Sequence, residues 1–371
     1  MLRDVLFRPF NAGGLSLANR VVMAPMTRCF SPHGVPGENV AAYYRRRAEN
    51  GVGLILTEGT WIPHPSASNE ETAPRFYGQD ALAGWARVVK EVHEAGGKIA
   101  PQLWHVGLSP KPKAEVYKDE TDDHTQSVSP SGYITPGAKV AEPMTDLQIA
   151  AIIGAYAEAA ASAQRLGFDG VEIHGAHGYL IDQFFWGETN KRTDSFGGDL
   201  IARTRFACEI VRAMRNSVGP DFPIILRYSQ WKLIDYAARM IDNPATLERF
   251  LAPLVDAGVD VFHCSQRRFW EPEFADSALN LAGWTKKLSG KPVISVGSVG
   301  LDTDLLGMGG EDVAAGSASF DKLLVMMERG DFDMIAIGRA LIANPDWADR
   351  VRRGEERSLK AFSPEQLAEL I

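Results

Sequence analysis

The sequence contains few cysteines, and none of them are paired at metal-binding spacing. Cys29, Cys208 and Cys264 are the only three in 371 residues, and no CxxC motif occurs. Zinc and iron–sulfur sites built from closely spaced thiolates are therefore not expected, and the site prediction includes no metal. A low and odd cysteine count is typical of proteins in a reducing compartment.

Long hydrophobic runs and excess positive charge are also missing. No run approaches the roughly 18 apolar residues that mark a membrane-spanning helix, and the net charge is −8. We therefore expect neither a membrane protein nor a nucleic-acid-binding protein. The opening MLRDVLFRPF lacks the basic and apolar regions of a signal peptide, so the protein is predicted to be cytoplasmic.

No GxGxxG fingerprint follows an early strand, which argues against a doubly wound dinucleotide-binding sheet. The chain contains instead eight short apolar runs, each followed by a helical pattern. The runs cover residues 20–26, 53–60, 97–105, 168–176, 222–229, 259–265, 291–297 and 332–338. Continuous apolar runs indicate parallel strands that are covered on both faces. Eight β–α units predict an α/β fold, a (β/α)8 TIM barrel that forms a single domain over residues 1–371.

Helix-capping residues support this assignment. Thr145 is the predicted N-cap and Gly167 the predicted C-cap of a helix at 146–167, and Asn243 is the predicted N-cap of another at 243–258. The segment 106–144 is too long for an ordinary connection and is rich in proline, serine, lysine and aspartate. We interpret it as an insertion after the third strand, on the active-site face, where it could form a lid.

Polar side chains stand at the carboxyl ends of nearly all predicted strands. They include Thr27, Arg28, Glu58, Gln102, His105, His174, His177, Tyr179, Arg227, His263, Cys264, Ser298 and Arg339. In a barrel these ends meet at one rim, where catalytic groups gather. His174, His177 and Tyr179 fall within six residues. Such a cluster of ionisable side chains is unfavourable in a hydrophobic core and indicates an active site that transfers protons.

Glycine, serine and arginine follow the seventh and eighth strands. Gly297 and Ser298 come first, and Gly338 directly precedes Arg339. Close backbone approach, a hydroxyl and a bidentate cation are the components of a phosphate site. These two strand ends are therefore predicted to bind a phosphate group.

Taken together, the strand ends carry a family pattern. The matching segments are NRVVMAPMTR (19–28), YYRRRAENGVGLILTEGT (43–60), QLWHVG (102–107), HGAHGYLIDQFF (174–185), NKRTDSFGG (190–198), VGSVG (296–300) and IGRALIANPDW (337–347). With these segments in this order, the chain resembles the Old Yellow Enzyme family of FMN-dependent NAD(P)H:flavin oxidoreductases, or ene-reductases. The resemblance extends over residues from about 5 to 355.

The resemblance implies one non-covalent FMN at the carboxyl-terminal rim. Thr27 matches a donor to the flavin C4 carbonyl, Gln102 a partner of the pyrimidine edge, and Arg227 a cation near N1. A fixed positive charge at that position stabilises an anionic reduced flavin. Residues that match the phosphate cradle or pack on the ring system are Pro25, Met26, Gly59, Gly297, Ser298, Gly338 and Arg339.

The resemblance also implies a separate role for each residue of the histidine–tyrosine cluster, which consists of His174, His177 and Tyr179. His174 and His177 match a pair that binds the substrate's carbonyl oxygen, and Tyr179 matches a proton donor. The implied reaction is ping-pong: NAD(P)H reduces the flavin, and a small-molecule activated alkene is then reduced at its C=C bond. A homo-oligomer is compatible with the family.

Departures from the commonest family pattern fall on the predicted pocket face. They are FWGE (185–188), RYSQWKLIDY (227–236) and SQRRFWEPEF (265–274). Trp104, Trp231 and Trp270 are candidate substrate-binding walls, although tryptophan is also a common core residue.

Three other functions stay open from the sequence. A single-domain flavin-dependent amine oxidase or demethylase would share the fold and cofactor. A metal-dependent barrel hydrolase would use His174, His177 and His263 as ligands, but the first strand lacks an HxH motif and the eighth strand lacks a carboxylate at its end. A flavin-storage barrel would leave the histidine–tyrosine cluster idle.

Overall fold

The computed structural model describes residues 2–68, 70–109, 127–301 and 317–371. Eight parallel strands close into a barrel in the order β10-β11-β12-β3-β4-β5-β8-β9. Their bounds are β3 Val21–Met23, β4 Leu54–Trp61, β5 Ile99–Trp104, β8 Val171–His177, β9 Ile224–Lys232, β10 Val261–Ser265, β11 Val293–Val296 and β12 Met334–Ile337. Each strand falls on one of the eight predicted apolar runs, so the predicted barrel is confirmed.

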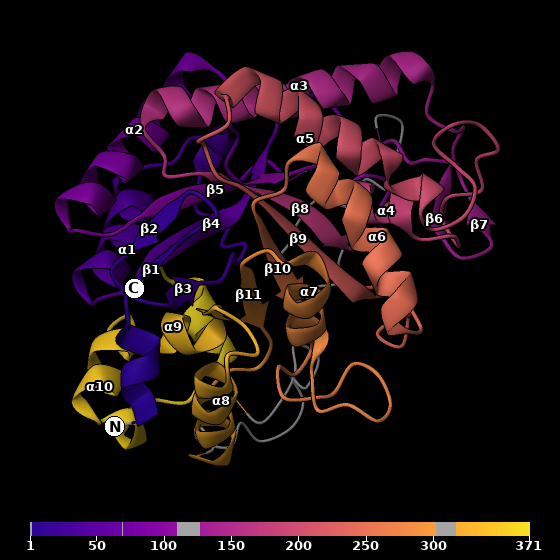
Figure 1. The fold of residues 1–371 in the computed structure, drawn as a ribbon. Coiled ribbons are helices and arrows are strands. Elements are labelled where there is room, and N and C mark those ends of the chain that lie inside the picture. The colour runs from indigo at the N-terminus through magenta and orange to yellow at the C-terminus, as the bar shows by residue number, and fades with distance from the viewer. Residues whose placement is uncertain (1, 69, 110–126, 302–316) are drawn as a thin grey trace.

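Helices surround the strands on the outside of the barrel (Figure 1). The longer ones are α1 Glu38–Glu49, α2 Gln79–Glu94, α3 Asp146–Leu166, α5 Arg205–Val218, α6 Pro244–Ala257, α7 Leu281–Ser289 and α8 Ser317–Arg329. Shorter helices are α4 Leu180–Phe185 after β8, α9 Arg339–Ala343 after β12, and α10 Trp347–Arg353 after α9; two 3-10 helices, Glu356–Ser358 and Pro364–Ala368, follow.

The predicted helix caps form as expected. Thr145 and Gln148 make a reciprocal capping box at the start of α3, and Gly167 adopts a left-handed conformation after its end. The Asn243 side chain accepts a hydrogen bond from the Thr246 amide at the start of α6. Local capping chemistry therefore determines where these two barrel helices begin.

Two hydrophobic layers hold the barrel together. The inner layer fills the barrel with inward-facing strand residues such as Val22, Leu56 and Ile294. A hairpin of β1 (Phe10–Ala12) and β2 (Leu15–Leu17) adds Phe10, and Leu15 as well, to that layer. The larger outer layer packs the strands against the helices. With one end filled by apolar side chains, the polar strand ends at the other rim are free to build a site.

The insertion after β5 is described only in part. Its second half holds a small hairpin, β6 (Tyr133–Thr135) with β7 (Ala138–Lys139), whereas residues 110–126 lie outside the described residues. The predicted lid role of 106–144 therefore stays a prediction.

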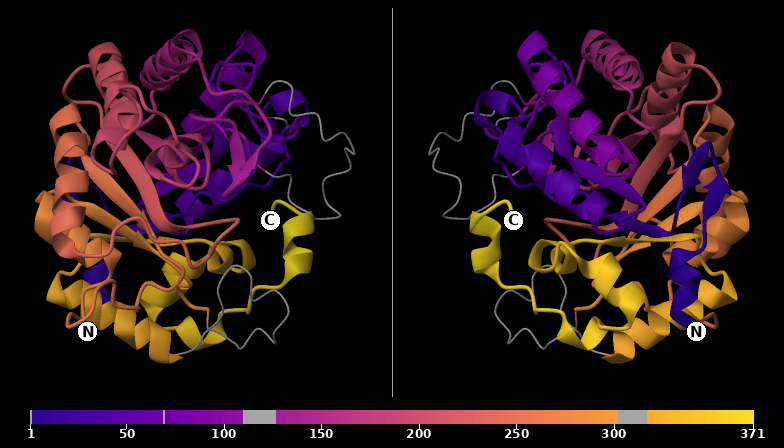
Figure 2. Two further views of the ribbon diagram at one scale, coloured as in Figure 1. Left: turned by 90° about the vertical axis from the view of Figure 1, so that its right-hand side faces the viewer. Right: turned by 90° about the vertical axis from the view of Figure 1, so that its left-hand side faces the viewer.

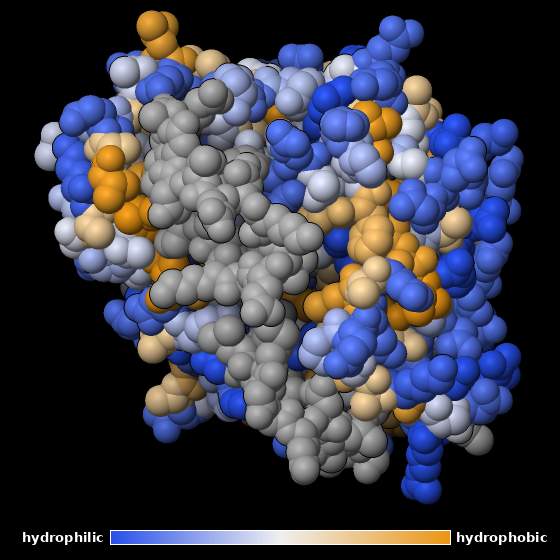
Figure 3. All heavy atoms as spheres, turned by 180° about the vertical axis from the view of Figure 1, so that it is seen from behind, coloured by the Kyte–Doolittle hydropathy of each residue, from blue (hydrophilic) through white to orange (hydrophobic). Residues whose placement is uncertain are grey.

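In the part of the face that Figure 3 draws in hydropathy colours, polar residues predominate and hydrophobic residues form patches. Large hydrophobic side chains that are exposed are Leu2, Val140, Leu147, Leu233, Ile234, Val325, Leu367 and Ile371. Within the described ranges, no helix combines the length and apolarity needed to cross a bilayer.

Residues 359–371 run back from the last helices toward the N-terminal half of the barrel (Figure 2). Two buried arginines from that half bind this C-terminal segment. Arg28 donates to the carbonyls of Gln366, Leu367 and Glu369, the last at 2.6 Å. Arg47 donates to the Ile371 carbonyl. The C-terminal segment is thereby held beside the rim where Thr27 and Arg28 lie.

Candidate active site

A cavity of about 530 Å³ opens at the carboxyl-terminal rim of the barrel. Seven of the eight strands or the segments directly after them contribute side chains, and β4 is the exception. The predicted site residues that line it are Pro25, Met26, Thr27, Gln102, Trp104, His174, His177, Tyr179, Arg227, Trp231, Gly297, Ser298, Gly338 and Arg339. The predicted rim site is therefore one continuous cavity.

Two predicted site residues lie elsewhere. Trp270 does not line the cavity formed by the described residues, and it packs edge-to-face on Phe269 with ring centroids 5.1 Å apart. Gly59 is buried behind the cavity, where a Cβ atom would come within 2.7 Å of the Trp104 ring. Gly59 therefore makes room for Trp104, which does line the cavity.

His174, His177 and Tyr179 converge at the end of β8. The His174 ring lies 5.1 Å from that of His177 and 4.9 Å from that of Tyr179, both nearly perpendicular. Trp104 meets Tyr179 edge-to-face at 5.1 Å, and Trp231 stacks on His177 at 4.3 Å. Two tryptophans thus fix the orientations of the three polar rings.

Burial and neighbouring cations keep both imidazoles neutral. The pKa of His174 and the pKa of His177 lie well below the ordinary range. Desolvation is the largest cause, and the positive charge of Arg227 is the second. The His174 Nδ1 accepts from the Ala176 amide at 3.4 Å, which leaves its proton on Nε2. His174 can therefore donate a hydrogen bond through Nε2 without carrying a charge.

The Tyr179 phenol also keeps its proton. Burial raises the pKa of Tyr179 to about 12, and Arg227 acts in the opposite direction. The side chain is only partly buried as a whole and borders the cavity. Across the physiological range Tyr179 is consequently a protonated weak acid that a cavity ligand can reach.

Arg227 and Ser265 connect β9 and β10 to the imidazoles. Arg227 donates to the Ser265 hydroxyl at 3.2 Å, and that hydroxyl lies 2.7 Å from His177 Nε2. The Arg227 Nε is buried and has no hydrogen-bond partner among the described residues. A buried donor of this kind is costly unless a ligand satisfies it.

A buried carboxylate orients Gln102. Glu172 accepts from Gln102 Nε2 at 2.7 Å and lies 2.6 Å from His263 Nδ1, and all three side chains are buried. Because the amide nitrogen is engaged by Glu172, the Gln102 carbonyl oxygen is available as an acceptor. Glu172 was not predicted from the sequence, although an acid inside the apolar run 168–176 is a detectable signal.

The cavity fits the flavin mononucleotide that the resemblance implies. Its described lining carries three guanidinium groups, of Arg227, Arg267 and Arg339, and no carboxylate, so it suits an anionic ligand in a chain of net charge −8. At Gly297 a Cβ atom would lie 2.6 Å from the Gln266 carbonyl oxygen, so this turn requires glycine. The Ser298 hydroxyl donates to the Arg267 carbonyl at 2.9 Å, which ties the turn after β11 to the segment after β10.

Several cavity residues were missed by the sequence analysis. They are Leu233, Tyr236, Gln266, Arg267, Val299, Leu301, Ile342, Phe362 and Leu367. The first four lie in 227–236 and 265–274, so these two departures contribute to the pocket. The third departure, 185–188, contributes no lining residue, and its Phe185 and Trp186 are buried. Phe362 and Leu367 come from the C-terminal segment, where no local motif indicates a site.

No cluster of three or more potential metal ligands occurs in the part of the chain that the structure describes. His174 and His177 adjoin each other, but His263 pairs with Glu172 through Nδ1.

Comparisons with known sequences find a family model and relatives that match nearly the whole chain. Residues 5–358 match the model of the NADH:flavin oxidoreductase / NADH oxidase family. The chain is 33% identical over 364 residues to 12-oxophytodienoate reductase 7 of Oryza sativa subsp. japonica, covering 94% of this chain and 87% of that protein. It is 31% identical to the NADH oxidase of Thermoanaerobacter brockii, covering 96% of this chain and 52% of that protein. The chain thus spans about half the length of that second relative.

A solved structure has the same architecture. Morphinone reductase in complex with tetrahydroNAD superimposes with a TM-score of 0.77 at 31% identity, covering 98% of this chain and 93% of that one. Similarity of sequence and of fold therefore coincide over nearly the whole chain.

Proposed function

The chain belongs to the NADH:flavin oxidoreductase / NADH oxidase family, and from that membership we propose that it is an FMN-dependent ene-reductase that reduces an activated alkene. The observation that carries the proposal is the meeting of His174, His177 and Tyr179 at one end of a cavity lined by Arg227. Two neutral imidazoles and a protonated phenol are the groups needed to bind a carbonyl oxygen and to supply a proton.

The flavin would be held by residues from five strand ends. Thr27, Gln102 and Arg227 would contact the ring system, next to Pro25 and Met26, and Gly297, Ser298, Gly338 and Arg339 would hold the phosphate. Bound FMN supplies the hydride chemistry that links the nicotinamide to the alkene. A nicotinamide that binds in the same cavity would explain why a separate dinucleotide-binding motif is dispensable.

His174 and His177 act on the alkene through its electron-withdrawing oxygen. Each donates a hydrogen bond to that oxygen, which polarises the double bond and stabilises the charge that develops on the oxygen. Tyr179 holds a proton for the carbon next to the carbonyl. Trp104 and Trp231 keep the two imidazoles and the phenol in place. We also propose that residues 1–371 form one catalytic domain and that the protein is cytoplasmic.

Anaerobic stopped-flow spectroscopy tests the function directly. NADH or NADPH should bleach the flavin absorption of the purified protein, and a simple cyclic enone should then restore it. A protein that carries no flavin, or a reduced flavin that the enone does not reoxidise, would contradict the proposal. Bleaching by a secondary or tertiary amine but by neither nicotinamide would indicate an amine oxidase instead.

A further inference from the structure

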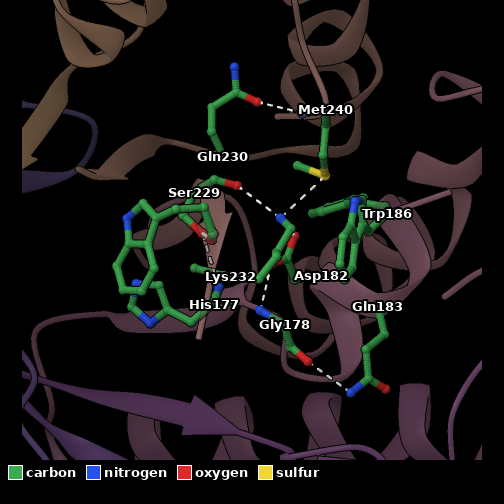
Figure 4. A network of polar contacts seen from close by, with 12 residues as sticks. His177, Gly178, Asp182, Gln183, Trp186, Ser229, Gln230, Lys232 and Met240 are labelled. Atoms are coloured by element: carbon green, nitrogen blue, oxygen red, sulfur yellow. Dashed lines mark hydrogen bonds and ion pairs between the residues drawn. The ribbon is translucent and has the colours of Figure 1, made fainter. Parts of the chain in front are cut away.

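A fully buried ion pair lies directly behind the His177 turn (Figure 4). The Lys232 ammonium is 2.6 Å from Asp182 Oδ1, and neither side chain is exposed to solvent. Lys232 comes from the end of β9 and Asp182 from α4. A buried pair of full charges is expensive to desolvate, so its position next to the candidate site needs a reason.

The turn between β8 and α4 has an unfavourable backbone. His177 has a φ of 67° and Gly178 a φ of 85°. A left-handed conformation is costly for a histidine and is kept only where the surroundings impose it. This turn determines where the His177 imidazole and the Tyr179 phenol point.

Three hydrogen bonds impose that conformation. The Gly178 amide donates to Asp182 Oδ2 at 2.7 Å, and the His177 amide donates to the Ser229 hydroxyl at 3.0 Å. The Leu233 amide donates to the His177 carbonyl at 3.1 Å. The turn is therefore bound by α4 on one side and by the end of β9 on the other.

A bulge brings β9 to the turn. Gly175 pairs with Tyr228, but His177 pairs with Lys232, so one residue of β8 faces the three residues 229–231 of β9. Extra residues in a strand bend it and redirect its side chains. The bulge places Ser229 against the His177 amide and leaves Trp231 stacked on the imidazole.

One ammonium group joins these parts. Besides Asp182, Lys232 Nζ donates to the Ser229 carbonyl at 3.3 Å and contacts Met240 Sδ at 3.4 Å, while the Trp186 ring lies 5.9 Å away. These contacts use the three donors of an ammonium group. Lys232 thus ties α4, the bulge and the following loop together at a single point.

We propose that Lys232 and Asp182 are positioning residues that hold the His177 turn, and so aim His177 and Tyr179 at the substrate. The inference rests on the function proposed above, because it assigns the aimed groups their roles. A directional pair suits this task, since its geometry fixes both the Gly178 amide and the bulge, whereas an apolar contact would fix neither.

Loss of the cation alone should introduce a pH dependence. Burial raises the pKa of Asp182, and the Lys232 ammonium counteracts it. The other charged or titratable groups here are Asp235, which acts on Lys232, and His177, whose pKa is lowered. Without Lys232, Asp182 is protonated and neutral at low pH. It becomes an unpaired buried carboxylate as the pH rises, which should disturb the turn.

The experiment compares four FMN-loaded proteins: wild type, Lys232→Met, the double variant Lys232→Met/Asp182→Asn, and the control Lys286→Met. The Asp182→Asn change keeps an acceptor for the Gly178 amide while removing the unpaired charge. Lys286 forms a Lys–Asp pair of similar length, 2.8 Å, with Asp333 just before β12, at the opposite end of the barrel. Each protein is measured for thermal stability, affinity for a phenol (which should bind the two histidines) and the rate of enone reduction against pH.

In the Lys232→Met variant, we expect phenol affinity and enone rate to lie below those of wild type at every pH, and the difference from wild type should grow as the pH rises. The double variant should lose that pH dependence but remain roughly tenfold or more below wild type in both readouts. Lys286→Met should change stability only. Wild-type phenol affinity and enone rate in the double variant would overturn the positioning role. Failure of the wild type itself to reduce the enone would overturn the proposed function instead.

Discussion

Glu58 is a buried carboxylate that organises the segment next to the proposed flavin site. Its Oε2 accepts from the amides of Arg28 at 2.8 Å and Cys29 at 3.0 Å, directly after Thr27. Burial raises the pKa of Glu58 to about 7, and the two amide hydrogen bonds act in the opposite direction. Glu58 is thus a titratable group that binds the backbone directly after Thr27.

This raised pKa predicts a pH-dependent stability. Between the ordinary value of 4.5 and about 7, the folded protein binds a proton that the unfolded chain has lost, so stability should fall as the pH rises through that window. Glu58→Gln should remove this contribution, which is on the order of 3 kcal/mol. Thermal unfolding of both proteins from pH 4.5 to 8 measures it. Parallel stability curves for variant and wild type would contradict the expectation.

Tyr179 permits a test that separates the two half-reactions. Tyr179→Phe removes the protonated phenol while keeping the ring that packs against Trp104 and His174. Alkene reduction should slow by roughly a hundredfold, and flavin reduction by NAD(P)H should keep its rate, because that step needs no proton from Tyr179. Single-turnover kinetics of each half supply the measurement, and equal losses in both would argue against a proton donor.

At the scale of elements, most of the fold could be predicted because its signals are local. Apolar runs of strand length, capping residues such as Thr145 and Asn243, and the glycine after α3 each act within a few residues. The bulge in β9 could not be predicted in this way, since it depends on which residue of β8 opposes Lys232. The departure from the family pattern at 227–236 indicated where the bulge lies but not its geometry.

The C-terminal segment is an element whose role depends on distant contacts. Phe362 and Leu367 line the cavity, while Arg28 binds the backbone around Leu367. Both side chains lie beyond residue 358, where the family match ends. This segment therefore forms a pocket wall that lies outside the family match.

Shortening that wall should weaken flavin binding. Phe362→Ala removes a buried ring that lies 5.9 Å from the Arg339 guanidinium, so FMN should bind less tightly, as measured by flavin titration. The stability cost should be about 3 kcal/mol. Phe332→Ala is the matched control, because Phe332 is buried and lies outside the cavity lining. An equal loss of FMN affinity in both variants would remove Phe362 from the flavin site.

At the scale of the whole molecule, the cavity makes stability depend on its ligand. Three guanidinium groups line the site without a carboxylate among the described lining residues. An anionic ligand that binds only the folded state raises stability with its concentration, by about 2.7 kcal/mol at a hundredfold excess over Kd. FMN should therefore raise the melting temperature of flavin-free protein by several degrees.

Riboflavin offers a control for this prediction, because it has the ring system of FMN and lacks the phosphate. It should raise the melting temperature less than FMN does, since Arg339 and the glycines near it would have no phosphate to bind. Thermal denaturation at matched ligand concentrations decides the point. Equal stabilisation by both ligands would argue against the phosphate cradle.

The barrel, its capped helices and the rim cluster of His174, His177 and Tyr179 could all be inferred from the residues. Strand periodicity and capping are short-range, and the parallel strands of a barrel bring their carboxyl ends together. Only the folded chain shows that Glu172 holds Gln102, that Lys232 meets Asp182, and that the C-terminal segment walls the cavity. These partners lie far apart in sequence. Which of them meet is decided by packing and strand register, which no local pattern encodes.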